Sequence, residues 1–358
     1  MVDIIRLQLG EKVGQWTVVG KLGEGGFGSV YKGKRDLCIE NRKLKGKNKS
    51  KFFSFRIEPE RNMYAWSDKL LKMEVYVLKL ANERKRRHFC TCEDTGIYKK
   101  CLYLVMTLVG PCLQDIRKEL PEKKFSMGCA LSVGIQCLEA IEELHAIGFL
   151  HRDIKPSNYA TGRGKLSELR RIYILDFGMC RSYLDEHGQF RRPRKIVGFR
   201  GTVRYASLSC HIRRETCRKD DIESWLYQQI EVTRGALPWR SLDDNKDDVA
   251  IFKERCRFEV GLQELMGGCP REYVEILRYV DSLRFYDNPN YDKIYRLMKR
   301  AMSVQQVQEF PYDWERSLNK LTNSDKSETC WKSGSHQTFL ISPFVAQFGY
   351  YPRKQRTF

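Results

Sequence analysis

The chain has 358 residues, of which 42% are hydrophobic and 30% are charged, a composition typical of a folded globular protein. This length is large for one compact core and suits two lobes or two small domains. No run approaches eighteen apolar residues, and the first residues have neither a basic start nor a long apolar core, so we expect no membrane span and no signal peptide.

The formal net charge is +19, from 64 Lys and Arg against 45 Asp and Glu, and the excess is clustered at 42–51, 84–87 and 191–204. Such runs are found at nucleic-acid contacts, in nuclear import signals, at sites for acidic or phosphorylated proteins, and in solvated loops. For residues 42–51 we favour a solvated loop. The 13 cysteines include no CxxC pair, which indicates reduced thiols. We therefore expect a cytoplasmic protein, with the nucleus as a further location.

The first predicted element is a β-hairpin over residues 16–33, closed by a glycine-rich turn. β-branched and aromatic residues lie on both sides of Gly23, Gly25 and Gly28, which is typical of paired strands. A dinucleotide-binding fingerprint has the same glycine spacing, but it needs a helix directly after the glycines, and residues 27–34 favour a strand. We therefore expect either an ordinary glycine turn or a flap whose backbone N–H groups bind phosphate oxygens.

The remaining elements change in type along the chain. Strands are expected at 52–58 and 102–110, and a helix at 67–82 with Ser67 as N-cap and Glu74 within its apolar face. Apolar positions then recur at helical spacing, over 126–148, 219–234, 271–285 and 291–302. The pattern predicts a strand-rich part followed by a mostly helical part, with a polar tail from about residue 315.

Two short segments carry the chemistry: HRDIKPSN at 151–158 and Asp176-Phe177-Gly178. Asp153 can accept a proton from an attacking hydroxyl, and Lys155 can reach a transferring phosphate as a point charge. Asn158 and Asp176 offer the amide and carboxylate oxygens that Mg²⁺ prefers. Each residue alone could be an ordinary polar side chain, but the set in this order indicates phosphoryl transfer from ATP to a hydroxyl.

Seven strings carry a family resemblance: GEGGFGSV (23–30), LKMEVYVLKL (71–80), VMTLVGP (105–111), HRDIKPSNYATG (151–162), LDFGMCRSY (175–183), GFRGTVRYAS (198–207) and DDIESWLY (220–227). The chain resembles the protein kinase family, within it the casein kinase 1 group, and most of all the tau-tubulin kinase branch. The family's Ala-Pro-Glu is replaced by Ala206-Ser207-Leu208, as is common in this group.

The resemblance implies an α+β, bilobal protein kinase fold. A domain over about 14–314 would have a small β-rich lobe with one main helix to about residue 108 and a larger helical lobe from about 109. Residues 1–13 would be an N-terminal extension and 315–358 a polar C-terminal tail.

The resemblance also implies ATP and Mg²⁺ as cofactors and assigns roles by position. Asp153 would be the base, Lys155 the phosphate contact, Asn158 and Asp176 the metal ligands, and Thr202 a support for the catalytic loop. The ATP site would comprise Leu22, Gly23, Gly25, Gly28, Val30, Arg56, Glu74, Met106, Leu108, Val109 and Ala160.

One residue departs from the family pattern, because Arg56 stands where the strand motif Ala-x-Lys-x-Glu has lysine. A planar guanidinium keeps the charge, but it is longer and bulkier than an ammonium. We expect Arg56 to pair with Glu74 and to hold the phosphates less well. Two interpretations stay open: a serine/threonine protein kinase of reduced or ordinary rate, and a catalytically impaired pseudokinase scaffold that binds nucleotide or partners.

Basic residues between the Asp-Phe-Gly segment and Tyr205 flank the expected substrate cleft: Arg181, Arg191, Arg192, Arg194, Lys195 and Arg200. They predict protein substrates that are acidic or already phosphorylated, unless the loop is charged without being selective. Nucleic acid is not an expected partner, because the sequence has no zinc-ligand spacing and no RNA-recognition signature. The sequence gives no indication of the oligomeric state.

Overall fold

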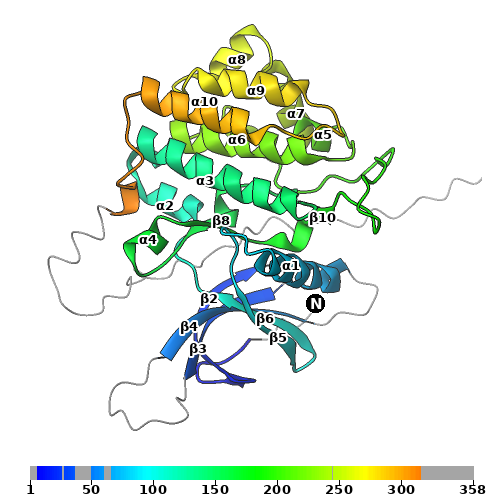
Figure 1. The fold of residues 1–358 in the computed structure, drawn as a ribbon, viewed down its shortest axis with the longest axis vertical. Coiled ribbons are helices and arrows are strands. Elements are labelled where there is room, and N and C mark those ends of the chain that lie inside the picture. The colour runs from blue at the N-terminus through cyan, green and yellow to red at the C-terminus, as the bar shows by residue number, and fades with distance from the viewer. Residues whose placement is uncertain (1–5, 26–27, 37–49, 60–65, 244, 316–358) are drawn as a thin grey trace, which may run out of the picture.

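The computed structural model describes residues 6–25, 28–36, 50–59, 66–243 and 245–315, and it consists of a small β-rich lobe and a larger helical lobe (Figure 1). This is the predicted α+β bilobal fold. Residues 42–49 of the basic run and 316–358 of the expected tail lie outside the described residues.

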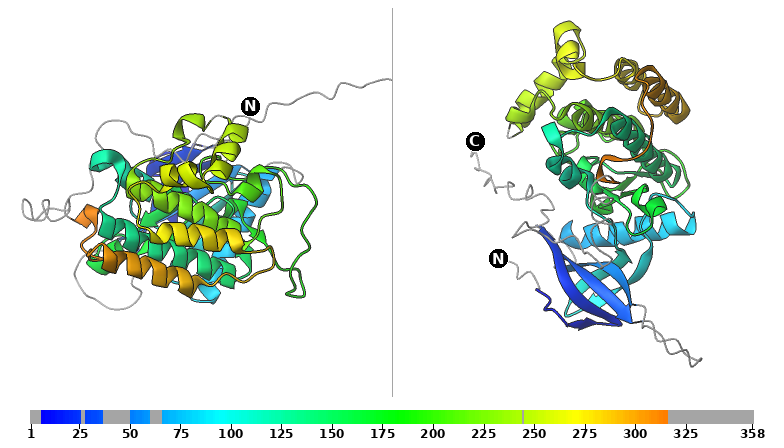
Figure 2. Two further views of the ribbon diagram at one scale, coloured as in Figure 1. Left: turned by 90° about the horizontal axis from the view of Figure 1, so that it is seen from above. Right: turned by 90° about the vertical axis from the view of Figure 1, so that its left-hand side faces the viewer.

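The small lobe is built on an antiparallel sheet in the order β1-β2-β3-β4-β6-β5, with one helix, α1, between the sheet and the large lobe (Figures 1 and 2). The predicted hairpin is confirmed, because β2 is followed directly by strand β3 and not by a helix. The elements are β1 (Lys12–Val13), β2 (Trp16–Gly25), β3 (Gly28–Asp36), β4 (Ser50–Pro59), α1 (Trp66–Glu83), β5 (Cys92–Tyr98) and β6 (Cys101–Thr107).

Side chains alternate between the two faces of β4, as they must in a strand. Phe53, Phe55 and Ile57 are buried in the core of the small lobe. Ser54 and Arg56 point to the opposite face, and Arg56 lies opposite Val30 of β3 and Leu104 of β6. The alternation therefore fixes which side of the sheet carries the unusual arginine.

Strands β6 and β5 of the small lobe differ from expectation. The strand predicted at 102–110 ends at Thr107, because Gly110 and Pro111 follow and proline lacks a backbone N–H for the ladder. The edge strand β5 was not predicted, since Cys92–Tyr98 is largely polar and most of it is only partly buried.

The large lobe packs its helices around α3 and α6 (Figure 2). Both central helices are buried along most of their length, whereas α10 buries one face only. Gly134 permits the close approach of α3 and α6, because a Cβ there would overlap the side chain of Gln229. The helices are α2 (Leu113–Glu119), α3 (Met127–Ala146), α4 (Leu166–Leu169), α5 (Leu208–His211), α6 (Arg218–Arg234), α7 (Lys246–Arg255), α8 (Glu259–Met266), α9 (Glu272–Ser282) and α10 (Tyr291–Val304).

The segments that carry the predicted chemistry lie where the two lobes meet. Two small antiparallel strand pairs frame them, β7 (Phe149–Leu150) with β10 (Arg181–Ser182), and β8 (Tyr159–Thr161) with β9 (Ile172–Ile174). The 3-10 helices η2 (Pro156–Asn158) and η3 (Phe177–Met179) lie within the two motifs, and η3 packs against α1 of the small lobe.

Candidate active site

The buried carboxylate of Asp221, near the start of α6, holds the catalytic loop in shape. It accepts the backbone N–H groups of His151 at 2.7 Å and Arg152 at 2.8 Å, and it lies 2.9 Å from Nε2 of His145. Burial opposes its ionisation, but the hydrogen bond and charge of His145 outweigh burial and lower the pKa of Asp221. Asp221 was not predicted from the sequence, although two adjacent aspartates at a helix start were a visible signal.

The predicted base lies in a compact polar cluster. Oδ1 of Asp153 accepts the hydroxyl of Thr202 at 2.7 Å, and Oδ2 lies 2.7 Å from Nζ of Lys155. The same ammonium donates to Thr202 at 3.0 Å. Gly201 has φ +101°, and a Cβ there would lie 2.6 Å from the carbonyl oxygen of Arg152, so the segment carrying Thr202 reaches the catalytic loop only with glycine at 201.

The two predicted metal ligands lie beside this cluster and have the donor chemistry that Mg²⁺ requires. The amide nitrogen of Asn158 donates to the carbonyl oxygen of Asp153 at 2.8 Å, which leaves the amide oxygen to coordinate. Leu175 N–H donates to the Asn158 carbonyl at 2.8 Å and so keeps the two motifs in register. Among the described residues no group of three His, Cys, Asp or Glu could hold a metal.

The orientation of Asp176 is set by its backbone and by its neighbour. Asp176 adopts a left-handed conformation with φ 63° and ψ 73°. The following Phe177 is fully buried, stacked on Phe89 with 5.2 Å between ring centroids and edge-on to His151 at 5.8 Å. These contacts hold the Asp-Phe-Gly segment in one position.

Arg56 contacts two carboxylates of the site. Its Nη1 donates to Oε2 of Glu74 at 2.7 Å, as expected, and it also lies 3.4 Å from Oδ1 of Asp176. Burial opposes ionisation of Asp176, but the positive charges of Arg56 and Lys155 outweigh it and lower the pKa of that carboxyl. The guanidinium would therefore compete with a metal ion at one of the two predicted ligands.

The predicted adenine-site residues come from both lobes. Leu22, Val30 and Met106 lie on β2, β3 and β6 of the sheet. Leu108 and Val109 belong to the half-buried link that leaves β6, and Ala160 is held next to that link by a β-bridge to Cys112. Gly23 lies opposite Val30, and only the backbone of Gly25 and Gly28 is described.

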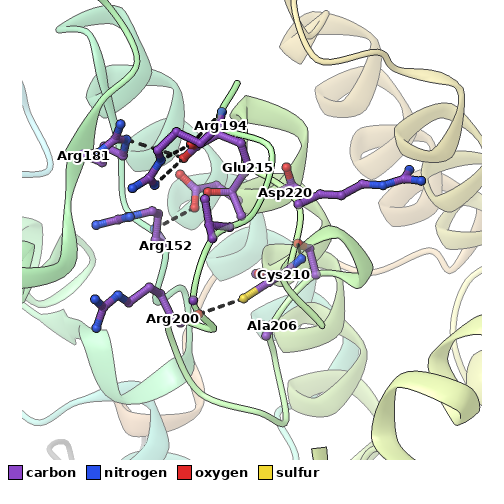
Figure 3. Close-up of a pocket in the computed structure, with 15 residues that line it drawn as sticks. Arg152, Arg181, Arg194, Arg200, Ala206, Cys210, Glu215 and Asp220 are labelled. Atoms are coloured by element: carbon purple, nitrogen blue, oxygen red, sulfur yellow. Dashed lines mark hydrogen bonds and ion pairs between the residues drawn. The ribbon is translucent and has the colours of Figure 1, made fainter. Parts of the chain in front are cut away.

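The predicted anion-binding residues separate into two groups. Arg181, Arg194 and Arg200 line a pocket of about 110 Å³ beneath the segment that follows Asp-Phe-Gly (Figure 3). Arg192 and Lys195 are exposed and do not line it. Arg152, expected beside the base and near this segment, also lines the pocket. Sequence reasoning did not place two further members, Arg214 and Glu215.

Comparison with known proteins identifies the family. A model of the protein kinase domain matches residues 16–264. A probable serine/threonine-protein kinase of Dictyostelium discoideum is 32% identical over 307 residues, covering 86% of this chain and 57% of the relative. The Caenorhabditis elegans serine/threonine-protein kinase spe-6 is 36% identical over 252 residues, covering 69% and 65%. A putative serine/threonine-protein kinase of the same nematode is 34% identical over 319 residues, covering 88% and 86%.

The chain thus spans less than two thirds of the length of the first two relatives. None of the described helices is long and apolar enough to cross a membrane.

Proposed function

The chain belongs to the protein kinase family, and we propose that it is an ATP-dependent serine/threonine kinase of the casein kinase 1 and tau-tubulin kinase type. One observation carries this proposal. Asp153, Lys155 and Thr202 form a hydrogen-bonded cluster directly beside Asn158 and Asp176. This cluster brings together a proton acceptor, a cation and two oxygen ligands for a metal, the set that phosphoryl transfer needs.

Each member of the cluster has a defined task in the proposed reaction. Asp153 accepts the proton of the attacking hydroxyl, and Thr202 fixes the carboxylate through its 2.7 Å hydrogen bond. Lys155 provides a positive charge within 2.7 Å of Asp153, where charge develops on the transferring group. Asn158 and Asp176 would hold Mg²⁺, which would supply positive charge to neutralise the phosphates of ATP.

We further propose that the substrates are proteins with acidic or phosphorylated residues near the acceptor. Arg200 lies two residues before Thr202, so its charge is close to the position where a substrate hydroxyl meets Asp153. Arg192 and Lys195 are exposed on the same segment and add positive charge to that side of the cleft. Opposite charge on the substrate would steer it to this surface and fix its register.

The alternative function is a pseudokinase scaffold, and the contact between Arg56 and Asp176 favours it. If that ion pair excludes the metal, the chain would bind nucleotide without Mg²⁺, or bind a partner only. The catalytic loop itself offers no support for this alternative, because Asp153 and Lys155 are intact.

Matched peptides test the proposed substrate class. Each would present a single serine or a single tyrosine, in an acidic or a neutral surrounding, with labelled ATP and Mg²⁺. We expect label in the acidic serine peptide first, the neutral serine peptide more slowly, and neither tyrosine peptide. Label in tyrosine would contradict the serine/threonine assignment, and equal rates for acidic and neutral peptides would contradict the substrate preference.

A further inference from the structure

The segment that follows Asp-Phe-Gly carries many arginines but no residue that could be phosphorylated over most of its length. From Leu184 to Gly201 the sequence has no serine, threonine or tyrosine. The flanking hydroxyls are engaged, because Ser182 donates to the Leu184 carbonyl at 2.6 Å, Tyr183 to the His145 carbonyl at 2.5 Å, and Thr202 to Asp153 at 2.7 Å. A phosphate on this segment therefore cannot be the group that neutralises its arginines.

The structure shows a different anion among these arginines, the carboxylate of Glu215 (Figure 3). Oε1 of Glu215 accepts Nη2 of Arg194 at 2.9 Å and lies 3.5 Å from Nε of Arg181. The side chain of Glu215 is 7% exposed, and a second hydrogen bond, from Nε of Arg194, makes the contact bidentate. Although burial opposes ionisation, the bonds and charges of the two arginines outweigh it and lower the pKa of Glu215.

Without this carboxylate, five arginines would share a small pocket with two buried aspartates, Asp220 and Asp221, whose oxygens already accept backbone N–H groups. Arg152, Arg181, Arg194, Arg200 and Arg214 all line the same space of about 110 Å³. The crowding is visible at Arg181, where burial and then the charge of Arg194 lower the pKa. A charge-assisted bidentate pair is strong enough to order a loop, which is the role that a phosphate has in other switch segments.

Glu215 also connects this segment to the helical lobe. Glu215 lies on the link that leads into α6, and the same link accepts the backbone N–H of Val197 through the Arg213 carbonyl at 3.1 Å. Arg181 belongs to β10, and Arg194 is on the exposed stretch in between. The carboxylate therefore ties the start and the middle of the segment to the helical lobe.

We propose that Glu215 is a built-in counter-anion that holds this segment in place, so that order there requires no phosphorylation. Glu215 is thus a positioning residue for the substrate side of the cleft. Its consequence for catalysis rests on the proposed kinase function, but its effect on the order of the segment does not.

Limited trypsin digestion of the full chain, after phosphatase treatment and removal of the phosphatase, tests the proposal. The bond after Lys195 is a direct reporter, because Lys195 and Ile196 are exposed and not followed by proline. The variant is Glu215→Gln. The matched control is Glu186→Gln, which makes the same charge change on the same segment at a residue that pairs only with the exposed His187 among the described residues.

In chloride we expect Glu215→Gln to be cleaved about tenfold faster than the native chain, the factor for one lost charge-assisted bond. Glu186→Gln should match the native chain. Inorganic phosphate at equal ionic strength should restore the protection of Glu215→Gln, because the added anion replaces the carboxylate. A native cleavage rate in Glu215→Gln would overturn the proposal, and so would fast cleavage that phosphate and chloride affect equally.

If Glu215→Gln does not unfold cooperatively, Arg194→Gln removes the same ion pair from its half-exposed side. It is expected to speed cleavage after Lys195 by a similar factor, and an unchanged rate would again overturn the proposal. This readout needs no catalysis, so a failure of the kinase proposal would appear separately, as absent phosphotransfer with a normal digestion pattern.

Discussion

Arg56→Lys is expected to raise the rate of phosphotransfer at least tenfold. In the structure Nη1 of Arg56 lies 2.7 Å from Glu74 and 3.4 Å from Asp176, so the guanidinium occupies both carboxylates. A lysine ammonium is compact and can pair with Glu74 while its remaining protons point toward the phosphates. It would also release Asp176 for the metal.

The size of this rate increase follows from the contact between Arg56 and Asp176. Two unit charges about 4 Å apart attract by roughly 4 kcal/mol at the effective dielectric constant of a protein surface, and solvent reduces this because the Asp176 side chain is 33% exposed. A tenfold rate change needs only about 1.4 kcal/mol. Loss of one preorganised contact costs about 10²–10³ in rate, so the native chain is expected to be a slow kinase that the substitution partly repairs.

Initial rates over a range of ATP–Mg²⁺ concentrations measure the effect and separate kcat from KM. The matched control is Arg35→Lys, the same chemical change at an exposed position of the neighbouring strand β3. We expect the control to leave both constants unchanged. If Arg56→Lys is no faster, or if Arg35→Lys is equally faster, the reasoning about position 56 is refuted.

Two other substitutions test the site and its support. Thr202→Ala is expected to lower kcat about tenfold with little change in KM, because Asp153 and Lys155 each lose a hydrogen bond. Thr202→Ser should restore kcat, and an unaffected kcat in Thr202→Ala would contradict the role of the hydroxyl. Burial lowers the pKa of Lys253, which lies beneath the segment that carries Thr202, to about 7. Between pH 7 and 10.5 the unfolded chain therefore binds one more proton than the folded chain. Folding stability relative to Lys253→Met should then rise by about 1.4 kcal/mol per pH unit across that window, and a flat difference in urea unfolding would contradict it.

The sequence predicted the elements and motifs that local patterns determine. The glycine-rich hairpin, the helix carrying Glu74 and the spacing of Asp153 from Asp176 depend on short-range periodicity and turn chemistry. These features could be predicted because each depends on a few neighbouring residues. The pairing of Arg56 with Glu74 was expected from the resemblance to the protein kinase family.

The contacts that could not be predicted join distant segments. The approach of Arg56 to Asp176 spans 120 positions and depends on how the two lobes close on each other. Glu215 belongs to no motif, and its meeting with Arg181 and Arg194 is set by the path of an irregular segment. Most side chains of edge strand β5 are only partly buried, so its sequence lacks the clear apolar pattern that predicts a strand.

The most direct test of the account is transfer of labelled γ-phosphate from ATP–Mg²⁺ to an acidic protein by the purified chain and by Asp153→Asn. The assay should detect a rate about 10³ below that of a typical kinase. We predict slow incorporation by the native chain that disappears in Asp153→Asn, because the substituted amide cannot accept the hydroxyl proton. Equal background in both proteins would contradict catalysis and leave the scaffold function as the interpretation to pursue.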